Sequence, residues 1–184
     1  MKNIIDYVEE ETRTFAERPL GGVDSLIFSQ LSYLNLEQFV PHADQRRPSV
    51  TLGQLASAEN CDALCENVRA ADRNRKLLLA IARSPRFRDV GVNYHVSRLD
   101  TVREEQFSAV TFLFADGSAY VAFRGTDATL IGWKEDFNMA FSDTVPSQIA
   151  SVGYLNEVGR LVKGSLIVGG HSKGGNLAVY AAMH

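Results

Sequence analysis

The segment from residue 165 to residue 183 constrains the fold more than any other part of the sequence. A short apolar run over residues 165–170 is followed by the turn residues 171–175 and then by an alanine-rich apolar stretch, residues 176–183. An almost unbroken apolar run of this length is typical of a central parallel strand that is covered on both faces. The segment therefore predicts a strand, a tight turn and a buried helix, the repeating unit of α/β proteins.

The composition is that of an ordinary globular domain. The chain has 184 residues, 45% of them hydrophobic and 22% charged, which is enough to bury a sizeable core in one domain. The formal net charge of −3 offers no electrostatic footprint for nucleic acid or an anionic membrane. Residues 1–6 become charged at once, which argues against a signal peptide, and no apolar run approaches the roughly 20 residues of a membrane span. We therefore expect a cytoplasmic protein.

The two cysteines, Cys61 and Cys65, lie four positions apart in a predicted helix. Side chains at this spacing share a face, but Cα atoms about 6 Å apart with parallel Cβ vectors suit a disulfide poorly. Two cysteines without a nearby histidine do not make a zinc site either. We expect reduced cysteines in the core, with redox or metal chemistry as the alternative.

The first half of the chain is predicted to be helical. Apolar residues recur at helical spacing over residues 4–16, and again after a cap at Asp24 or Ser25. A short helix is predicted to start at Thr51, and residues 61–82 are predicted to form one or two longer helices.

From Val90 onward the hydrophobic period changes to two, which is typical of strands. Alternation over residues 92–97 predicts a half-buried strand, and residues 107–115 and 118–124 predict two strands that flank an Asp-Gly hairpin turn. A later helix is predicted over residues 148–162, with five apolar side chains facing inward: Ile149, Val152, Leu155, Val158 and Leu161.

Within the turn after the apolar strand, Gly170-His171-Ser172-Lys173-Gly174 matches the G-x-S-x-G pattern of a nucleophile elbow. A nucleophilic serine must stand clear of the backbone on a sharp strand-to-helix turn, and glycines two residues away on either side let strand and helix approach. The helix N-terminus behind the serine offers N–H groups where an oxyanion forms. The alternative is a serine that merely caps the helix. A phosphate-binding loop is excluded because Lys173 precedes the second glycine instead of following it.

A second motif, Phe123-Arg124-Gly125-Thr126-Asp127, ends a predicted strand and is followed by Trp133 and Asp136. Together with the elbow it resembles the fungal-type (class 3) lipases of the α/β-hydrolase fold, and most closely a bacterial family of lipase-like hydrolases related to them. The resemblance runs from about residue 27 to the last residue and is strongest over residues 123–137 and 169–180.

The resemblance implies roles for four residues of this chain. Ser172 would be the nucleophile, and the oxyanion hole would be formed by Thr126 and by the backbone N–H of Lys173. Asp136 would support the Thr126 hydroxyl from behind, with a solvated helix carboxylate beside Glu135 as the alternative.

The expected fold class is α/β, with an α/β-hydrolase-like sheet that follows a helical N-terminal region. We expect a single domain over residues 1–184, with residues 1–89 mainly helical. Residues 90–184 would form the strand and helix core that carries the nucleophile elbow.

For the other polar candidates the sequence favours structural roles. The Lys173 side chain is expected to point into solvent, and His171 is expected to be structural. The sequence offers no partners for His42 or His95, and Glu104-Glu105 is predicted to be a solvated turn. We therefore expect neither a metal site nor a cofactor.

A serine hydrolase of this type also needs an acid and a histidine, in the order serine, acid, histidine. After Ser172 the sequence has no Asp or Glu and a single histidine, His184, about 18 Å farther along the same helix. Strand 165–170 would also lack a neighbour on its outer side, which is an aggregation hazard. We expect a chain truncated after the nucleophile helix, whose acid and histidine lie beyond residue 184, and an inactive relative is the alternative.

The expected function is that of a serine ester hydrolase acting by acyl transfer on a small-molecule or lipid ester. We expect activity in the full-length protein and little in these 184 residues alone. The alternative is a non-catalytic α/β-hydrolase-like scaffold with a binding role. The sequence indicates no nucleic-acid partner and specifies neither the acyl group nor the oligomeric state.

Overall fold

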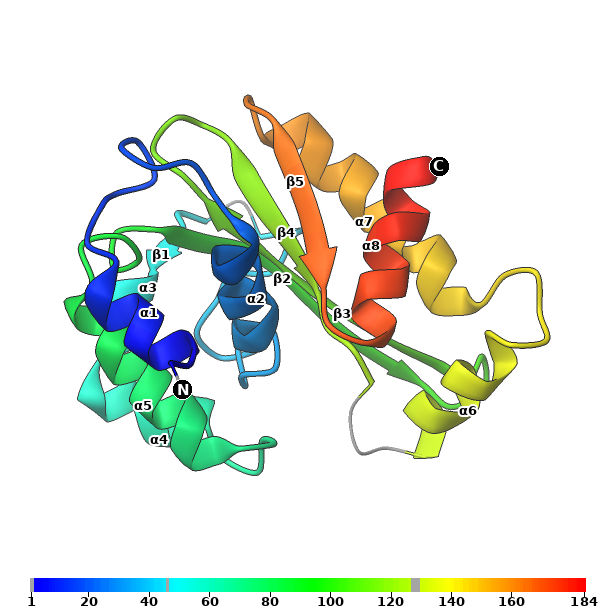
Figure 1. Cartoon of the computed structure of the whole chain (residues 1–184). Coiled ribbons are helices and arrows are strands. Elements are labelled where there is room, and N and C mark those ends of the chain that lie inside the picture. The colour runs from blue at the N-terminus through cyan, green and yellow to red at the C-terminus, as the bar shows by residue number, and fades with distance from the viewer. Residues whose placement is uncertain (1, 46, 127–129) are drawn as a thin grey trace.

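The fold is a five-stranded sheet with helices packed on both faces (Figure 1). The computed structural model describes residues 2–45, 47–126 and 130–184. Asp127, the last residue of the second motif, lies outside the described residues. The mixed α/β class that the sequence predicts is confirmed.

The strands lie side by side in the order in which they occur in the chain. They are β1 (Val50–Thr51), β2 (Gly91–Asp100), β3 (Glu105–Leu113), β4 (Ala119–Phe123) and β5 (Leu166–Gly170). The first four pair antiparallel, and β5 joins β4 in parallel, with Phe123 opposite Gly170. Because the carboxyl ends of parallel strands meet at one edge of a sheet, this register brings the segments after Phe123 and after Gly170 together.

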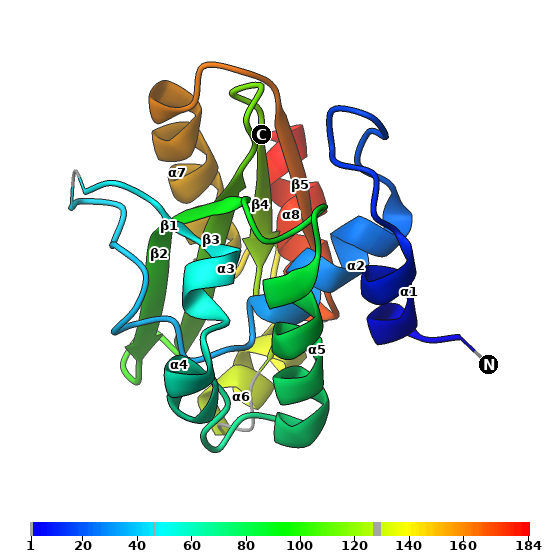
Figure 2. The same ribbon diagram turned by 90° about the vertical axis from the view of Figure 1, so that its left-hand side faces the viewer.

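The helices divide into an N-terminal group and a C-terminal group. The first group is α1 (Ile4–Glu10), α2 (Gly22–Leu31), α3 (Leu52–Leu55), α4 (Ala58–Leu64) and α5 (Ala71–Arg83). The second group is α6 (Leu130–Asn138), α7 (Pro146–Leu161) and α8 (Lys173–Met183). Figures 1 and 2 show α2 and its neighbours on one side of the sheet, and α7 and α8 on the other side.

Alternate side chains of the central strands feed two separate cores. Tyr120 and Ala122 of β4 pack with the N-terminal helices, whereas Val121 and Phe123 pack with α7 and α8. All five residues of β4 are therefore buried, as expected for a strand covered on both faces. Cys61 and Cys65 are free and buried in the first core, as predicted.

Several helix boundaries and faces differ from the sequence prediction. The first helix ends at Glu10 instead of near residue 16, since Glu11 turns to bind Arg13 and Arg18. On α7 the predicted inward positions Ile149 and Leu161 are exposed. Polar residues take part of that face: Ser147, Gln148 and Ser151 are buried.

One strand also differs from its prediction. The alternation predicted for residues 92–97 is broken by a bulge between Asn93 and Val96, which buries His95. The β5 strand lies at the edge of the sheet, and Ile167 is 39% exposed. Within the described residues its outer side has no neighbouring strand, as expected for residues 165–170. Within the described residues, no helix is both long and apolar enough to cross a membrane.

Candidate active site

Ser172 occupies the turn between β5 and α8, at the N-cap position of the helix. Its backbone has φ 58° and ψ −127°, a conformation that costs an L-residue roughly 1–3 kcal/mol and persists only where the surroundings enforce it. The side chain is exposed and makes no capping hydrogen bond. The hydroxyl therefore stands clear of the backbone, and the capping alternative does not apply.

Two glycines make this turn possible because strand and helix come too close for a side chain. A Cβ added at Gly170 would lie 2.4 Å from the backbone of Gly174, and one added at Gly174 would lie 2.1 Å from the Phe123 carbonyl oxygen. Real Cβ atoms do not approach backbone so closely. The spacing of the motif is thus a packing requirement of the β4–β5–α8 junction.

The end of β4 packs directly against the serine. A Cβ at Gly125 would lie 3.3 Å from Cβ of Ser172 and 2.4 Å from the carbonyl oxygen of His171. Since consecutive Cα atoms are 3.8 Å apart, the Cα of Thr126 lies within about 9 Å of the Cβ of Ser172. The structure therefore brings both sequence-predicted motifs to one place.

The hydroxyl of Thr126 donates a hydrogen bond of 2.5 Å to Oδ2 of Asp136 on α6. The structure thus joins these two residues, as the resemblance implied. Because its proton is directed at the carboxylate, the group that Thr126 can offer to an oxyanion is its backbone N–H. The other carboxylate oxygen of Asp136 is buried and accepts no hydrogen bond from the described residues.

The side chain of Lys173 does not point into solvent, so that expectation was wrong. Its Nζ donates to the carbonyl oxygen and to Oε1 of Gln106, at 2.7 and 2.9 Å, and to Oε2 of Glu135 at 2.9 Å. Both charged side chains are almost completely buried, at 1% and 0% exposure. A buried ammonium needs such a set of acceptors because desolvation would otherwise be prohibitive. The backbone N–H of Lys173 lies in the first turn of α8, where N–H groups lack intrahelical acceptors.

Two consecutive residues of α6 therefore bind the side chains of the two residues that are predicted to form the oxyanion hole. Glu135 binds the side chain of Lys173, and Asp136 binds the side chain of Thr126. Glu135 also accepts backbone N–H groups from Gln106 of β3 and Ser147 of α7, at 3.0 and 2.9 Å. From the sequence, Glu135 was expected only as a neighbour of Asp136, and no local signal indicates this role.

His171 and His184 each contact a tyrosine instead of the Ser172 hydroxyl. His171 is exposed, and its Nδ1 lies 3.2 Å from the Tyr33 hydroxyl. His184 stacks on Tyr180 toward the other end of α8. Among the described residues, no histidine makes a hydrogen bond with Ser172.

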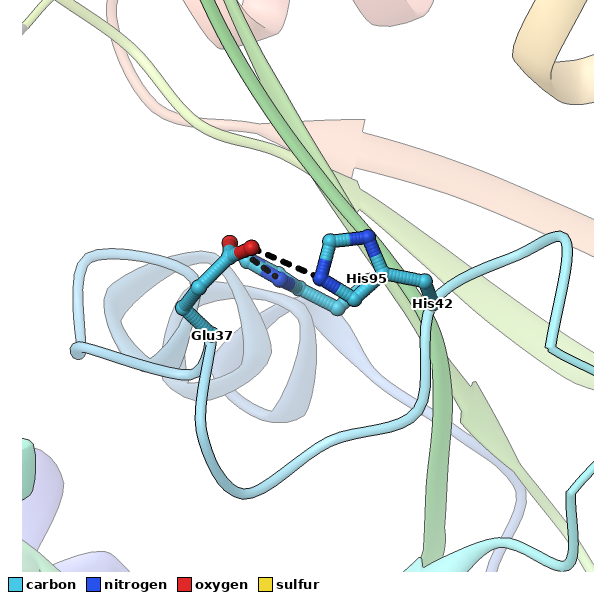
Figure 3. A group of neighbouring side chains, drawn as sticks. All are labelled: Glu37, His42 and His95. Carbon is cyan, nitrogen blue, oxygen red and sulfur yellow. Dashed lines mark ion pairs between the residues drawn. The ribbon is translucent and has the colours of Figure 1, made fainter.

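His42 and His95, for which the sequence offered no partners, lie together with Glu37 (Figure 3). Burial, with the neighbouring charges of His42 and Arg124, lowers the pKa of His95 to about 4, so its imidazole is neutral at pH 7. Neutral imidazole is the form in which histidine binds metals.

The predicted solvated turn at Glu104-Glu105 was half wrong. Glu104 accepts hydrogen bonds from Lys134 and Asn138 of α6, at 3.1 Å each. Glu105 begins β3 and is only 8% exposed, and burial raises its pKa.

Comparison with known proteins gives one family. Residues 81–184, more than half of the chain, match the model of the Mbeg1-like family. No curated protein and no solved structure matches the chain. The matched region includes the whole sheet except β1, together with Thr126, Asp136, Ser172 and Lys173. The chain therefore belongs to the Mbeg1-like family, a family of lipase-like α/β-hydrolases.

Proposed function

We propose that the protein is a serine ester hydrolase in which Ser172 is the nucleophile. The observation that carries this proposal is the backbone of Ser172 itself. An exposed serine is held in a strained conformation at a strand–helix turn, with no hydrogen bond to the helix that it begins. Strain of this kind is typical of positions where the direction of a side chain matters for function.

In the proposed reaction the Ser172 oxygen attacks the carbonyl carbon of an ester, and its proton passes to a general base. The carbonyl oxygen becomes an oxyanion that accepts hydrogen bonds from the backbone N–H groups of Lys173 and Thr126. The C–O bond to the alcohol then breaks, and the alcohol leaves with the proton from the base. Water then attacks the carbonyl carbon of the acyl-serine and gives a proton to the base. The bond from that carbon to the Ser172 oxygen breaks, the serine oxygen takes the proton from the base, and the acid is released.

Asp136 and Glu135 have positioning roles in this proposal. Asp136 binds the side chain of Thr126, and Glu135 binds the side chain of Lys173. In the proposal the backbone N–H groups of Thr126 and Lys173 face the oxyanion, so α6 sets the distance between these two donors. Fixed donors stabilise a developing charge without reorganising, which is where most of the rate enhancement of such sites arises.

We further propose that the acid and the histidine of the triad come from outside residues 1–184. The physical ground is the hydroxyl of Ser172, which no histidine among the described residues reaches. A serine without its base remains protonated, and loss of the base in a triad enzyme costs on the order of 10⁶ in kcat.

The same observation favours a second candidate, a non-catalytic α/β-hydrolase-like scaffold with a binding role. In this alternative the elbow would keep its geometry but would never be supplied with a base.

Covalent labelling of the serine distinguishes the two candidates. The natural gene product that contains these 184 residues should react with a fluorophosphonate probe and hydrolyse short acyl esters, and Ser172→Ala should abolish both. Ser165→Ala, which removes the hydroxyl of another exposed serine just before β5, is the matched control and should change neither. Residues 1–184 alone should retain only the residual rate that an oxyanion hole gives, about 10³-fold over water. An unlabelled gene product would favour the scaffold.

A further inference from the structure

Glu37, His42 and His95 form a second group of side chains, and each of them can act as a metal ligand (Figure 3). Glu37 and His42 belong to the segment between α2 and β1, and His95 belongs to β2. Each offers one ligand atom, and these atoms all lie within 4.8 Å of one another. None of the three takes part in the chemistry proposed for Ser172.

The backbone brings the two histidines together by direct pairing. His42 and His95 form an isolated parallel bridge, in which the His95 N–H donates to the carbonyl oxygen of Pro41 at 3.0 Å. The two imidazole rings lie 5.8 Å apart at an angle of 84°. One nitrogen of each ring faces the Glu37 carboxylate (Figure 3).

The bulge in β2 aims His95 at this group. Tyr94 has a φ of +55°, which is unusual for a residue other than glycine. Its N–H is held by the side-chain oxygen of Asn93 at 2.8 Å, and its carbonyl oxygen accepts from Tyr154 at 2.6 Å. Bulges commonly redirect a side chain near functional sites. Here the bulge buries His95 on the side of the sheet edge where Pro41 and His42 lie.

His95 carries an unsatisfied nitrogen that points into the group. The residue is 3% exposed, and its Nδ1 makes no hydrogen bond within the described residues. The nearest Glu37 oxygen lies 3.5 Å away, too far to form one with this geometry. Leaving a buried polar atom without a partner costs about 1–3 kcal/mol. A cation bound by Nδ1 of His95 would remove this cost.

We propose that His42, His95 and Glu37 bind a divalent transition-metal ion, with zinc as the ion that the ligand set fits best. Two imidazoles and a carboxylate are a common zinc ligand set, and three protein ligands leave one position open to water or another ligand. Zinc bonds of about 2.0–2.2 Å to these atoms require ligand atoms roughly 3.3 Å apart. The separations of 2.7 Å (His42 Nε2 to Glu37 Oε1) and 3.5 Å (His95 Nδ1 to Glu37 Oε2) lie on either side of that value, and the ligand atoms of the three residues all lie within 4.8 Å of one another. Small side-chain rotations would therefore bring them to metal-binding distances.

The test is metal binding by the untagged 184-residue chain after treatment with a chelator. Titration calorimetry with Zn²⁺ should give one equivalent per chain, and Co²⁺ should give the intense visible absorption of a tetrahedral site. Because an ion that binds only the native state stabilises it, Zn²⁺ should also raise Tm. Binding well below one equivalent, or no change in Tm, would overturn the proposal.

Single-ligand variants locate the ion. His42→Ala and Glu37→Gln, both on a surface segment, should each weaken Zn²⁺ binding at least 10-fold and remove the Tm shift. His95→Gln should do the same, and circular dichroism would show whether this buried variant is folded. His171→Ala is the matched control, since it removes an exposed histidine elsewhere and should bind like the wild type. Wild-type affinity in both His42→Ala and Glu37→Gln would mean that these residues form only a surface ion pair.

Discussion

Among the described residues, two ion pairs are completely buried, and they hold different parts of the molecule. Asp24 and Arg86 lie among the N-terminal helices, and Lys173 and Glu135 lie beside the candidate nucleophile. In each pair both side chains are at most 1% exposed. The cost of burying charge is therefore similar, and the difference is in what each pair holds.

The Asp24–Arg86 pair fastens the chain between α1 and α2. The guanidinium binds both carboxylate oxygens, at 2.8 and 2.7 Å, and stacks 3.9 Å from the ring of Phe15. Its remaining N–H groups donate to four backbone carbonyls of one loop: those of Arg13, Thr14, Arg18 and Pro19. Arginine suits this position because its five donors form a fixed planar fork.

The Lys173–Glu135 pair instead connects secondary structures around the elbow. One partner adjoins Ser172 in sequence, and the other adjoins Asp136. Their bonds reach β3 through Gln106 and α7 through Ser147. Burial of charge alone therefore does not distinguish the two pairs, whereas the residues that each pair holds do.

The largest predicted effect is on stability, at the first pair. Arg86→Met should lower the free energy of unfolding by about 3–5 kcal/mol, because it leaves the Asp24 carboxylate buried and unpaired. Urea denaturation followed by circular dichroism measures this loss. Arg83→Met, at an exposed arginine three residues earlier, should change stability by less than about 0.5 kcal/mol. Equal effects of the two variants would contradict a structural role for Arg86.

At the second pair, Lys173→Met should cost about 3 kcal/mol of stability for the same reason and should also slow fluorophosphonate labelling of Ser172. The double variant Lys173→Met/Glu135→Gln removes the unpaired charge and keeps an acceptor for neighbouring N–H groups. It should regain most of the stability but not the labelling rate. Recovery of both would make this pair as purely structural as the first.

The elbow could be predicted from the sequence because its signals are local. An apolar strand, glycines at fixed spacing and an apolar helix follow one another within residues 165–183. The Thr126–Asp136 contact was also expected, since both residues belong to a motif of the family that the chain resembles.

The buried pairs could not be predicted, because they join residues far apart in sequence: 62 positions for Asp24–Arg86 and 38 for Lys173–Glu135. In a local pattern, a charged residue on a helix indicates solvent. His95 was missed for another reason. Its burial depends on a bulge at Tyr94, a residue type that gives no signal for a positive φ.

A smaller effect is predicted for loss of the Thr126–Asp136 hydrogen bond, which positions only one of the two proposed oxyanion donors. Asp136→Ala in the natural gene product should slow labelling of Ser172 about 10- to 100-fold, because the Thr126 donor is displaced instead of removed. Asp136→Asn keeps an oxygen that can accept from the Thr126 hydroxyl and should recover much of the rate. Asp143→Ala, at an exposed aspartate in the following loop, is the control. A rate for Asp136→Ala equal to that of the control would remove Asp136 from the site.

The smallest predicted effect concerns pH and the loop that Arg86 fastens. Hydrogen bonds from Arg13, together with Arg18, hold the pKa of Glu11 well below its ordinary value of 4.5. A carboxyl whose pKa is lower in the folded state binds its proton more weakly there than in the unfolded chain. Its stabilisation is therefore present above pH 4.5 and is lost as the pH falls through the folded-state pKa.

Glu11→Gln should accordingly have a lower urea midpoint than the wild type at pH 7, and the two midpoints should converge as the pH is lowered below about 4.5. Glu9→Gln, which alters an exposed glutamate on α1, should follow the wild type at every pH. The Asp24–Arg86 pair is unchanged in both variants. The experiment therefore measures the contribution of Glu11 and its arginine partners separately from that of the buried pair. A difference between Glu11→Gln and wild type that stays constant down to pH 2 would show that Glu11 acts through packing, without the charge that its arginine partners stabilise.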